Sequence, residues 1–198
     1  LGYNGFKTSN WRMMFRNELS LLDRKCSQYC EELEFPIIVK PANFGSSNSL
    51  NTANDMATLR HAIKIALAQD EKVVVEEFVK GKEIEVAVIG YDTLTVSEPG
   101  EVVIKKDDFD FNSMFSRHEY IVPADIDPDV AVLLKETAEQ VYRLMGCSGM
   151  ARIDFYYNEA GDIVISQINP VPEISADSMF VKLMENEGYN FTELISLL

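Results

Sequence analysis

Two segments of the chain carry residue types that suit a nucleoside triphosphate and a divalent cation. The first, residues 35–47, reads FPIIVKPANFGSS and places Lys40 at the end of an apolar run, ahead of a Gly-Ser-Ser loop. A strand would hold the Lys40 ammonium rigidly beside a phosphate. Gly45 would let the backbone N–H groups of Ser46 and Ser47 approach the same anion. The segment therefore predicts a phosphate-binding loop.

This loop differs from the two commonest nucleotide-binding patterns. The chain contains neither G-x-x-x-x-G-K-[ST] nor G-x-G-x-x-G. P-loop NTPases and Rossmann dehydrogenases are therefore not the leading interpretations.

The second segment, residues 150–173, reads MARIDFYYNEAGDIVISQINPVPE. Asp154 and Asn169 offer the hard oxygen ligands that magnesium prefers. Arg152 lies two residues before Asp154, on the same face of a strand, where its planar fork could hold a phosphoryl group. Taken alone, each segment is more often an ordinary strand and turn. The occurrence of both segments in this order predicts a nucleotide bound together with a cation.

Three further stretches make a family resemblance specific. They are VVVEEFVKGKEIEVAVIG at 73–90, IVPADI at 121–126 and GCSGMARIDF at 146–155. From about residue 35 to its C-terminus, the chain resembles the ATP-grasp superfamily and, within it, the D-alanine:D-alanine ligases with their D-serine and D-lactate variants. The resemblance implies an α+β fold, with two sheet-and-helix lobes and a nucleotide between them.

The resemblance implies roles in ATP binding for the first segment and for the E-E-F-V stretch. Lys40 contacts the phosphates, while Gly45, Ser46 and Ser47 close over them and Ser46 also takes a catalytic role. In the adenine hinge, Glu76 would accept a hydrogen bond from the adenine amino group, and Glu77 and Val79 would contact the base through their backbones. Phe78 lies between them, and Glu83 would bind the ribose hydroxyls.

It also implies the reacting centre. Arg152 would steady the acyl phosphate and the tetrahedral intermediate, and Mg²⁺ or Mn²⁺ would be bound by Asp154, Gln167 and Asn169. Ser178 and its neighbour Met179 would bind the second amino acid.

Three positions depart from the family pattern. Gln167 stands where the family has a glutamate that bridges two cations, and an amide offers one neutral oxygen in place of a charge. Glu173 replaces a glycine whose backbone N–H polarises the reacting carboxyl, and Met114 replaces a substrate-binding lysine. Nucleotide binding is therefore expected to be better preserved than ligation.

The leading functional hypothesis is an ATP-dependent carboxylate–amine ligase that works through an acyl phosphate in peptidoglycan precursor synthesis. Its substrates would be small-molecule amino acids, and a homodimer is a possible assembly. A catalytically impaired ATP-grasp module that binds nucleotide is the alternative. A structural lobe that functions with a further domain is a third interpretation.

Composition bounds the other partners. The 198 residues carry a net charge of −14, which argues against nucleic acid because phosphate backbones attract basic patches. No apolar stretch approaches the roughly 20 residues of a membrane span, so a cytoplasmic protein without a membrane partner is expected. The cysteines at 26, 30 and 147 suit reduced thiols better than a disulfide framework or a zinc site.

Periodicity predicts the elements that position these residues. Helices are expected over 11–33, 55–69 and 128–146 and from residues 178 and 191, and strands over 36–40, 93–97, 100–104, 149–157 and 163–168. Strands 72–78 and 83–90 are expected to form a hairpin.

The resemblance, placed on these elements, implies the domain boundaries. They are a connecting segment and helix at 1–34, an ATP-grasp central lobe at 35–78 and an ATP-grasp C-terminal lobe at 79–198. The resemblance implies a further N-terminal domain of about 100 residues, so the chain is expected to be a fragment, a processed product or a short relative.

Overall fold

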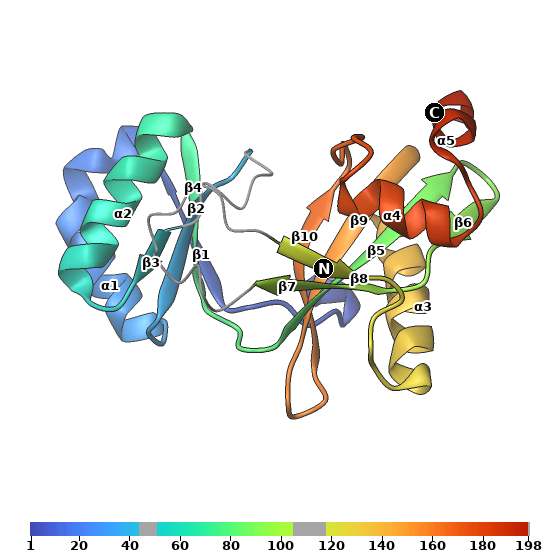
Figure 1. Ribbon diagram of the computed structural model, residues 1–198. Coiled ribbons are helices and arrows are strands. Elements are labelled where there is room, and N and C mark those ends of the chain that lie inside the picture. Colours follow the sequence, from blue (N-terminus) through green and yellow to red (C-terminus); the bar gives the residue numbers. More distant parts are fainter. Residues whose placement is uncertain (44–50, 105–117, 198) are drawn as a thin grey trace. The chain divides into compact units, whose positions relative to one another are not determined.

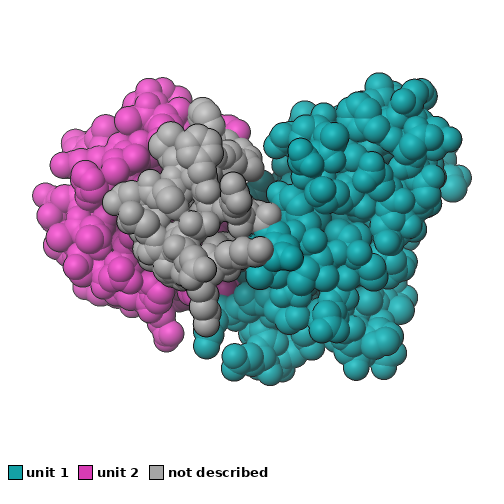
Figure 2. Space-filling model, viewed as in Figure 1, with its two compact units in different colours: residues 1–8, 80–198 teal, residues 9–79 magenta. Residues whose placement is uncertain are grey.

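The structure, a computed structural model, describes residues 1–43, 51–104 and 118–197. Contacts divide the chain into two compact units, coloured separately in Figure 2. Unit 1 comprises Leu1–Thr8 and Lys80–Leu198, and unit 2 comprises Ser9–Val79. Unit 2 is thus an insertion between two parts of unit 1.

Unit 2 contains a four-stranded antiparallel sheet in the order β1-β4-β2-β3 (Figure 1). The strands are β1 (Trp11–Phe15), β2 (Ile37–Pro41), β3 (Asn51–Ala53) and β4 (Lys72–Glu77). Helices α1 (Leu22–Glu32) and α2 (Met56–Gln69) cover one face of this sheet, and the 3₁₀ helix η2 (Arg16–Leu21) leads into α1. Alternate strand residues such as Val39, Val73 and Val75 pack beneath the helices. The intervening residues, including Lys40 and Glu76, therefore share the opposite face.

Unit 1 is built on a six-stranded antiparallel sheet in the order β10-β9-β5-β7-β8, with β6 paired to β5. The strands are β5 (Lys82–Gly90), β6 (Leu94–Val96), β7 (Gly100–Ile104), β8 (His118–Ile121), β9 (Gly149–Tyr157) and β10 (Ile163–Asn169). Helix α3 (Pro128–Leu144) packs on one face; α4 (Met179–Asn186) and α5 (Phe191–Leu197) share a second core with the other face. A short 3₁₀ helix, η1 (Gly2–Asn4), opens the unit.

Residues 1–34 do not form one body in the structure. Residues 1–8 join unit 1, where the Ile165 N–H donates to the Lys7 carbonyl at 2.9 Å and Lys7 forms an ion pair with Asp162. Residues 9–34, with β1 and α1, belong to unit 2.

The prediction of one helix over 11–33 is wrong in its first part. Trp11–Phe15 is a strand that pairs along its whole length with β4, from Trp11 opposite Glu76 to Phe15 opposite Lys72. Five residues are too few for apolar spacing to separate a strand from a helical turn. Pairing with β4 decides the outcome, and Met14 on this strand packs in the core of unit 2.

The predicted hairpin between strands 72–78 and 83–90 is also wrong. The two strands exist, but β4 lies in unit 2 and β5 in unit 1. Both edges of β4 are already occupied, by β1 and by β2, so no edge is left for β5. Gly81 instead approaches the end of β9 so closely that a Cβ there would lie 2.6 Å from the Tyr157 carbonyl oxygen.

The predicted starts of the helices α2, α3 and α4 are confirmed. The Asp55 side chain accepts a hydrogen bond from the Thr58 N–H at the start of α2, and Asp127 caps α3 with Pro128 at its first position. Ser178 caps α4. None of the helices in the described ranges is long and apolar enough to cross a membrane.

Phe155 anchors the core between the unit 1 sheet and α3, with 0 % of its surface exposed. Phe155→Ala should lower the free energy of unfolding by about 3–5 kcal/mol, because it removes a large buried ring and leaves a cavity. Urea unfolding followed by circular dichroism measures the loss. Val171→Ala, at a position that is 75 % exposed, is the control and should change stability by less than about 0.5 kcal/mol. Equal effects of the two changes would contradict the assigned core.

Candidate functional site

A polar cluster lies on one face of the unit 1 sheet, on the neighbouring strands β5 and β9. Glu85 is directly opposite Asp154, and Ala87 is opposite Arg152. Because side chains alternate along a strand, Glu83 and Glu85 share this face with Arg152 and Asp154. The residues between them, including Ile84 and Ile153, point into the core beneath α3. The same two strands therefore build the core and hold the cluster.

A β-bulge in β10 brings two further polar residues to this face. Ile165 pairs with Phe155, and after an irregularity at Ser166, Gln167 pairs with Asp154. The extra residue shifts the alternation by one. Without it, Ser166 would oppose Asp154 and Gln167 would turn toward the core. With it, Gln167 lies opposite Asp154, and Asn169 lies opposite Arg152.

Arg152 and Asp154 form a two-point ion pair. The Arg152 Nε donates to Asp154 Oδ1 at 2.7 Å and Nη2 donates to Oδ2 at 2.9 Å. Asp154 is only 4 % exposed, so this pair is held largely out of water. Burial lowers the pKa of Arg152, but the hydrogen bonds and charge of Asp154, with the charges of Glu85 and Glu83, outweigh it and raise that pKa overall.

Glu85 is a member of the cluster that the sequence prediction missed. It is 5 % exposed, and its Oε2 lies 3.1 Å from the Arg152 Nε, although the angle does not make a hydrogen bond. Burial, and then the charge of Asp154, raise the pKa of Glu85 to about 9, while Arg152 opposes the shift. Burial is also the main cause that raises the pKa of Glu83, and the negative charge of Asp154 is the second cause. The alternation Glu83-Ile84-Glu85 was the available signal.

The donor types of this cluster fit magnesium or manganese. Among the described residues, no three His, Cys, Asp or Glu side chains are grouped as a metal site. The predicted ligand set offers one carboxylate, that of Asp154, with the amide oxygens of Gln167 and Asn169. Magnesium commonly takes one or two carboxylates together with phosphate oxygens and water. The Asn169 Oδ1 already accepts from the Val171 N–H at 3.1 Å.

In unit 2, Lys40 and Glu76 form the second candidate cluster. Lys40 lies opposite Val74, and Glu76 lies opposite Ile38, so both side chains rise from the face without helices. The Lys40 Nζ is 2.5 Å from the Glu76 Oε1. The Ser9 hydroxyl donates to Glu76 Oε2 at 3.0 Å. The predicted phosphate lysine and the predicted adenine acceptor are therefore direct neighbours.

The predicted hinge residues continue from β4. The Glu77 N–H donates to the Asn10 carbonyl and the Phe78 N–H to the Pro36 carbonyl, each at 3.0 Å. Glu77 also accepts from the Asn10 side chain at 2.7 Å and from the Glu34 N–H at 2.9 Å. The N–H groups of Glu77 and Phe78 are thus engaged within unit 2, and a base contact through the Val79 backbone stays a prediction.

The family of the chain is shown by its similarity to known proteins. The family described as "D-ala D-ala ligase C-terminus" matches residues 2–198. The chain belongs to this family. A D-alanine--D-alanine ligase from Chlorobaculum parvum is 39 % identical over 176 residues, which cover 87 % of this chain and 48 % of the relative. The chain thus spans about half the length of the curated relative it matches.

Solved structures agree on the fold. The VanG D-Ala:D-Ser ligase from Enterococcus faecalis superposes with a TM-score of 0.85 at 27 % identity, covering 99 % of this chain and 58 % of that one. The D-alanyl-alanine synthetase A from Vibrio cholerae superposes with a TM-score of 0.81 at 26 % identity, covering 98 % of this chain and 60 % of that one. The D-alanine-D-alanine ligase from Coxiella burnetii superposes with a TM-score of 0.80 at 23 % identity, covering 100 % of this chain and 52 % of that one. At this identity the match supports the fold alone. The predicted ATP-grasp α+β fold is confirmed.

Three of the predicted site residues of this ligase-family chain, Gly45, Ser46 and Ser47, lie outside the described residues, and so does the predicted departure at Met114. The roles predicted for the three residues therefore stay predictions.

The residues predicted around the second amino acid have structural contacts within unit 1. Ser178 accepts hydrogen bonds from the Val181 and Ser175 N–H groups, both at 3.4 Å. Met179 is 2 % exposed and packs in the core with α4. The Glu173 carboxylate accepts from the Ser175 hydroxyl at 2.8 Å. Substrate binding by Ser178 and Met179 stays a prediction.

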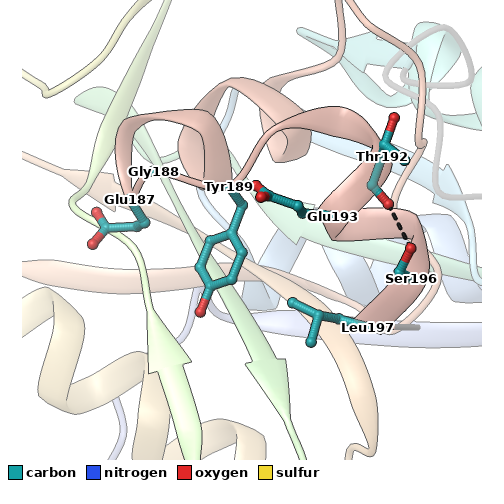
Figure 3. A pocket seen from close by; sticks show the side chains of 7 residues that line it. All are labelled: Glu187, Gly188, Tyr189, Thr192, Glu193, Ser196 and Leu197. Carbon is teal, nitrogen blue, oxygen red and sulfur yellow. Dashed lines mark hydrogen bonds between the residues drawn. The ribbon is translucent and has the colours of Figure 1, made fainter.

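A surface pocket of unit 1 lies elsewhere, beside the segment that joins α4 to α5 (Figure 3). Tyr189 is one of its lining residues, and its hydroxyl is 3.2 Å from Thr95 Oγ1. The Ser196 hydroxyl donates to the Thr192 carbonyl at 2.8 Å, which is the dashed line in Figure 3. The pocket is lined by Glu187, Gly188, Tyr189, Thr192, Glu193, Ser196 and Leu197. None of these was predicted as a site residue.

Asp70 anchors the described chain just before the predicted phosphate loop. Its carboxylate accepts from the Asn43 N–H at 2.7 Å, the Asn43 Nδ2 at 3.0 Å and the Lys72 N–H at 3.3 Å. Burial opposes ionisation, but the hydrogen bonds from Asn43, Lys72 and Glu71 outweigh it and lower the pKa of Asp70.

This lowered pKa predicts a pH dependence of stability. A carboxyl whose pKa is lower in the folded state adds stability above its unfolded value, near 3.9, and loses it as pH falls through the folded value. Asp70→Asn should therefore destabilise the chain more at pH 7 than at pH 3, as measured by urea unfolding. Asp92→Asn, at an exposed position, should show no such difference. A destabilisation by Asp70→Asn that is the same at both pH values would contradict the prediction.

Proposed function

We propose that this chain is the ATP-binding and catalytic portion of a cytoplasmic ATP-dependent carboxylate–amine ligase of the D-alanine:D-alanine type, active in peptidoglycan precursor synthesis. The observation that carries the proposal is the buried Arg152–Asp154 pair, with Gln167 and Asn169 brought to the same face by the bulge. Family membership and the printed activities of the relatives support it.

The proposed reaction has two steps. A carboxylate oxygen of the first amino acid attacks the γ-phosphorus of ATP, and ADP leaves. The amine of the second amino acid then attacks the acyl carbon, phosphate leaves, and the nitrogen loses a proton. The side chains contribute positioning and charge stabilisation. A bound Mg²⁺ or Mn²⁺ would neutralise charge on the phosphates.

Each unit has its own proposed roles. In unit 2, Lys40 leaves its ion pair with Glu76 and binds the ATP phosphates. Glu76 is then able to accept a hydrogen bond from the adenine amino group. In unit 1, Glu83 binds the ribose hydroxyls.

The reacting groups lie on the unit 1 sheet. Arg152 stabilises the acyl phosphate, while Asp154, Gln167 and Asn169 hold the cation. D-amino acids are the proposed substrate class, and a homodimer is the proposed assembly.

One observation favours a second candidate, a module that binds nucleotide without ligating. Gln167 lies directly opposite Asp154, where a second carboxylate would hold a second cation. A neutral amide weakens the attraction for that ion.

Release of ADP by the intact protein separates the two candidates. With Mg²⁺, ATP and a panel of D-amino and D-hydroxy acids, a ligase releases ADP in step with product. Binding of ATP without substrate-dependent ADP release would favour the second candidate, and absence of both would overturn the two together.

Lys40→Ala should weaken binding of Mg-ATP by about 1.5–3 kcal/mol, the usual value of a hydrogen bond to a charged group. Isothermal titration calorimetry measures the change, and circular dichroism checks that the variant is folded. Lys64→Ala, on the exposed side of α2, should bind ATP like the unchanged chain. Equal affinity of the Lys40 variant would remove this residue from the phosphate site.

Gln167→Glu should tighten the binding of a second Mn²⁺, because it places a second carboxylate opposite Asp154. Mn²⁺ titration in the presence of a non-hydrolysable ATP analogue gives the stoichiometry and affinity. Gln140→Glu, on exposed α3 surface, adds the same charge away from the cluster and serves as the control. If stoichiometry and affinity stay unchanged, Gln167 does not govern cation loading.

A further inference from the structure

Glu85 faces Arg152 from the neighbouring strand, and the proposed function gives it no role. The Glu85 and Asp154 backbones are directly paired, and both carboxyl groups approach the same guanidinium. Glu85 is as deeply buried as Asp154. A buried carboxyl group at such a position is costly unless a partner accepts or donates to it.

The Arg152 Nε carries a single hydrogen, and Asp154 now receives it. That bond is 2.7 Å long, while the Glu85 Oε2 at 3.1 Å receives no hydrogen bond among the described residues. One N–H cannot be directed at both oxygens at once. Glu85 Oε2 is therefore an acceptor already in place, within reach of a small rotation of the guanidinium.

A cation at Asp154 would disturb this arrangement. Both oxygens of Asp154 are engaged by Arg152, through Nε and Nη2. A divalent cation bound to either oxygen would lie close to the guanidinium, and two positive charges in a buried site repel strongly. Occupation of Asp154 by the cation thus requires Arg152 to turn to another acceptor.

We propose that Glu85 is a positioning residue that takes over the Nε–H of Arg152 when a divalent cation occupies Asp154. The inference rests on the proposed function, in which Asp154 binds the cation. With Nε–H held by Glu85, the guanidinium stays over the sheet. Its two NH₂ groups then become available to an oxyanion, the geometry in which arginine binds phosphate.

The Arg152 Nε–H signal in a ¹⁵N NMR spectrum tests the exchange of partners directly. Arg152→Lys removes this signal and so assigns it. In the unchanged chain the signal should persist both without cation and with Mg²⁺ plus a non-hydrolysable ATP analogue. In Glu85→Val it should persist without cation and be lost to solvent exchange once the cation is added.

Two controls accompany the measurement. Mn²⁺ binding, followed by electron paramagnetic resonance, checks that both forms take up a cation. Glu101→Val removes a carboxylate from the neighbouring strand β7, on the opposite face of the sheet, and should leave the signal unchanged in both states.

Each outcome decides the matter. A signal that survives in cation-bound Glu85→Val, or that disappears from the cation-bound unchanged chain, overturns the role of Glu85 while the cation site stands. Failure of the unchanged chain to bind Mn²⁺ overturns the proposed cation site and the inference with it. If Glu85→Val does not fold, Glu85→Ala replaces it. It also removes the acceptor, so the Nε–H signal should again be lost in the cation-bound state, and a signal that survives there overturns the proposal.

Discussion

The two-point ion pair between Arg152 and Asp154 is the interaction around which unit 1 is organised. It places opposite charges two residues apart on one strand, with bonds of 2.7 and 2.9 Å, on a sheet whose other face is apolar. Removing Arg152 would leave the buried Asp154 carboxylate without this cationic partner, which is far more costly than never having placed the pair. The pair therefore constrains what can lie on β5 and β10 beside it.

Strand alternation is the means by which this constraint is met. On β5 and β9 the same few residues serve the core with one face and the polar cluster with the other. Helix α4 packs on part of the second face, through Met179 and its neighbours. The polar cluster shares that second face. The site and the core are thus not separate regions, and a change of register would damage both.

Much of this arrangement can be predicted from the sequence. The family resemblance implied the α+β fold, and local patterns predicted the starts of helices α2 and α3 and the strands β9 and β10. What could not be predicted depends on long-range pairing. The strand Trp11–Phe15 forms because β4 offers an edge, and β4 cannot join β5 because both its edges are used. In the sequence, the only sign of the bulge at Ser166 was the pair of consecutive polar residues Ser166 and Gln167. The only sign that Glu85 belongs to the cluster was its position two residues after Glu83, on the same face of the strand.

The insertion of unit 2 into unit 1 has a mechanical consequence. The first and last segments of unit 2 are hydrogen bonded to each other, through Asn10 and Glu77 and along β1 and β4. Both chain ends belong to unit 1, and residues 1–8 are held there by Lys7 and Thr8 against β10 and the turn before it. Tension applied between residues 1–8 and the rest of unit 1 would thus be carried by contacts inside unit 1. Unit 2 would bear none of this force until residues 1–8 detach from unit 1.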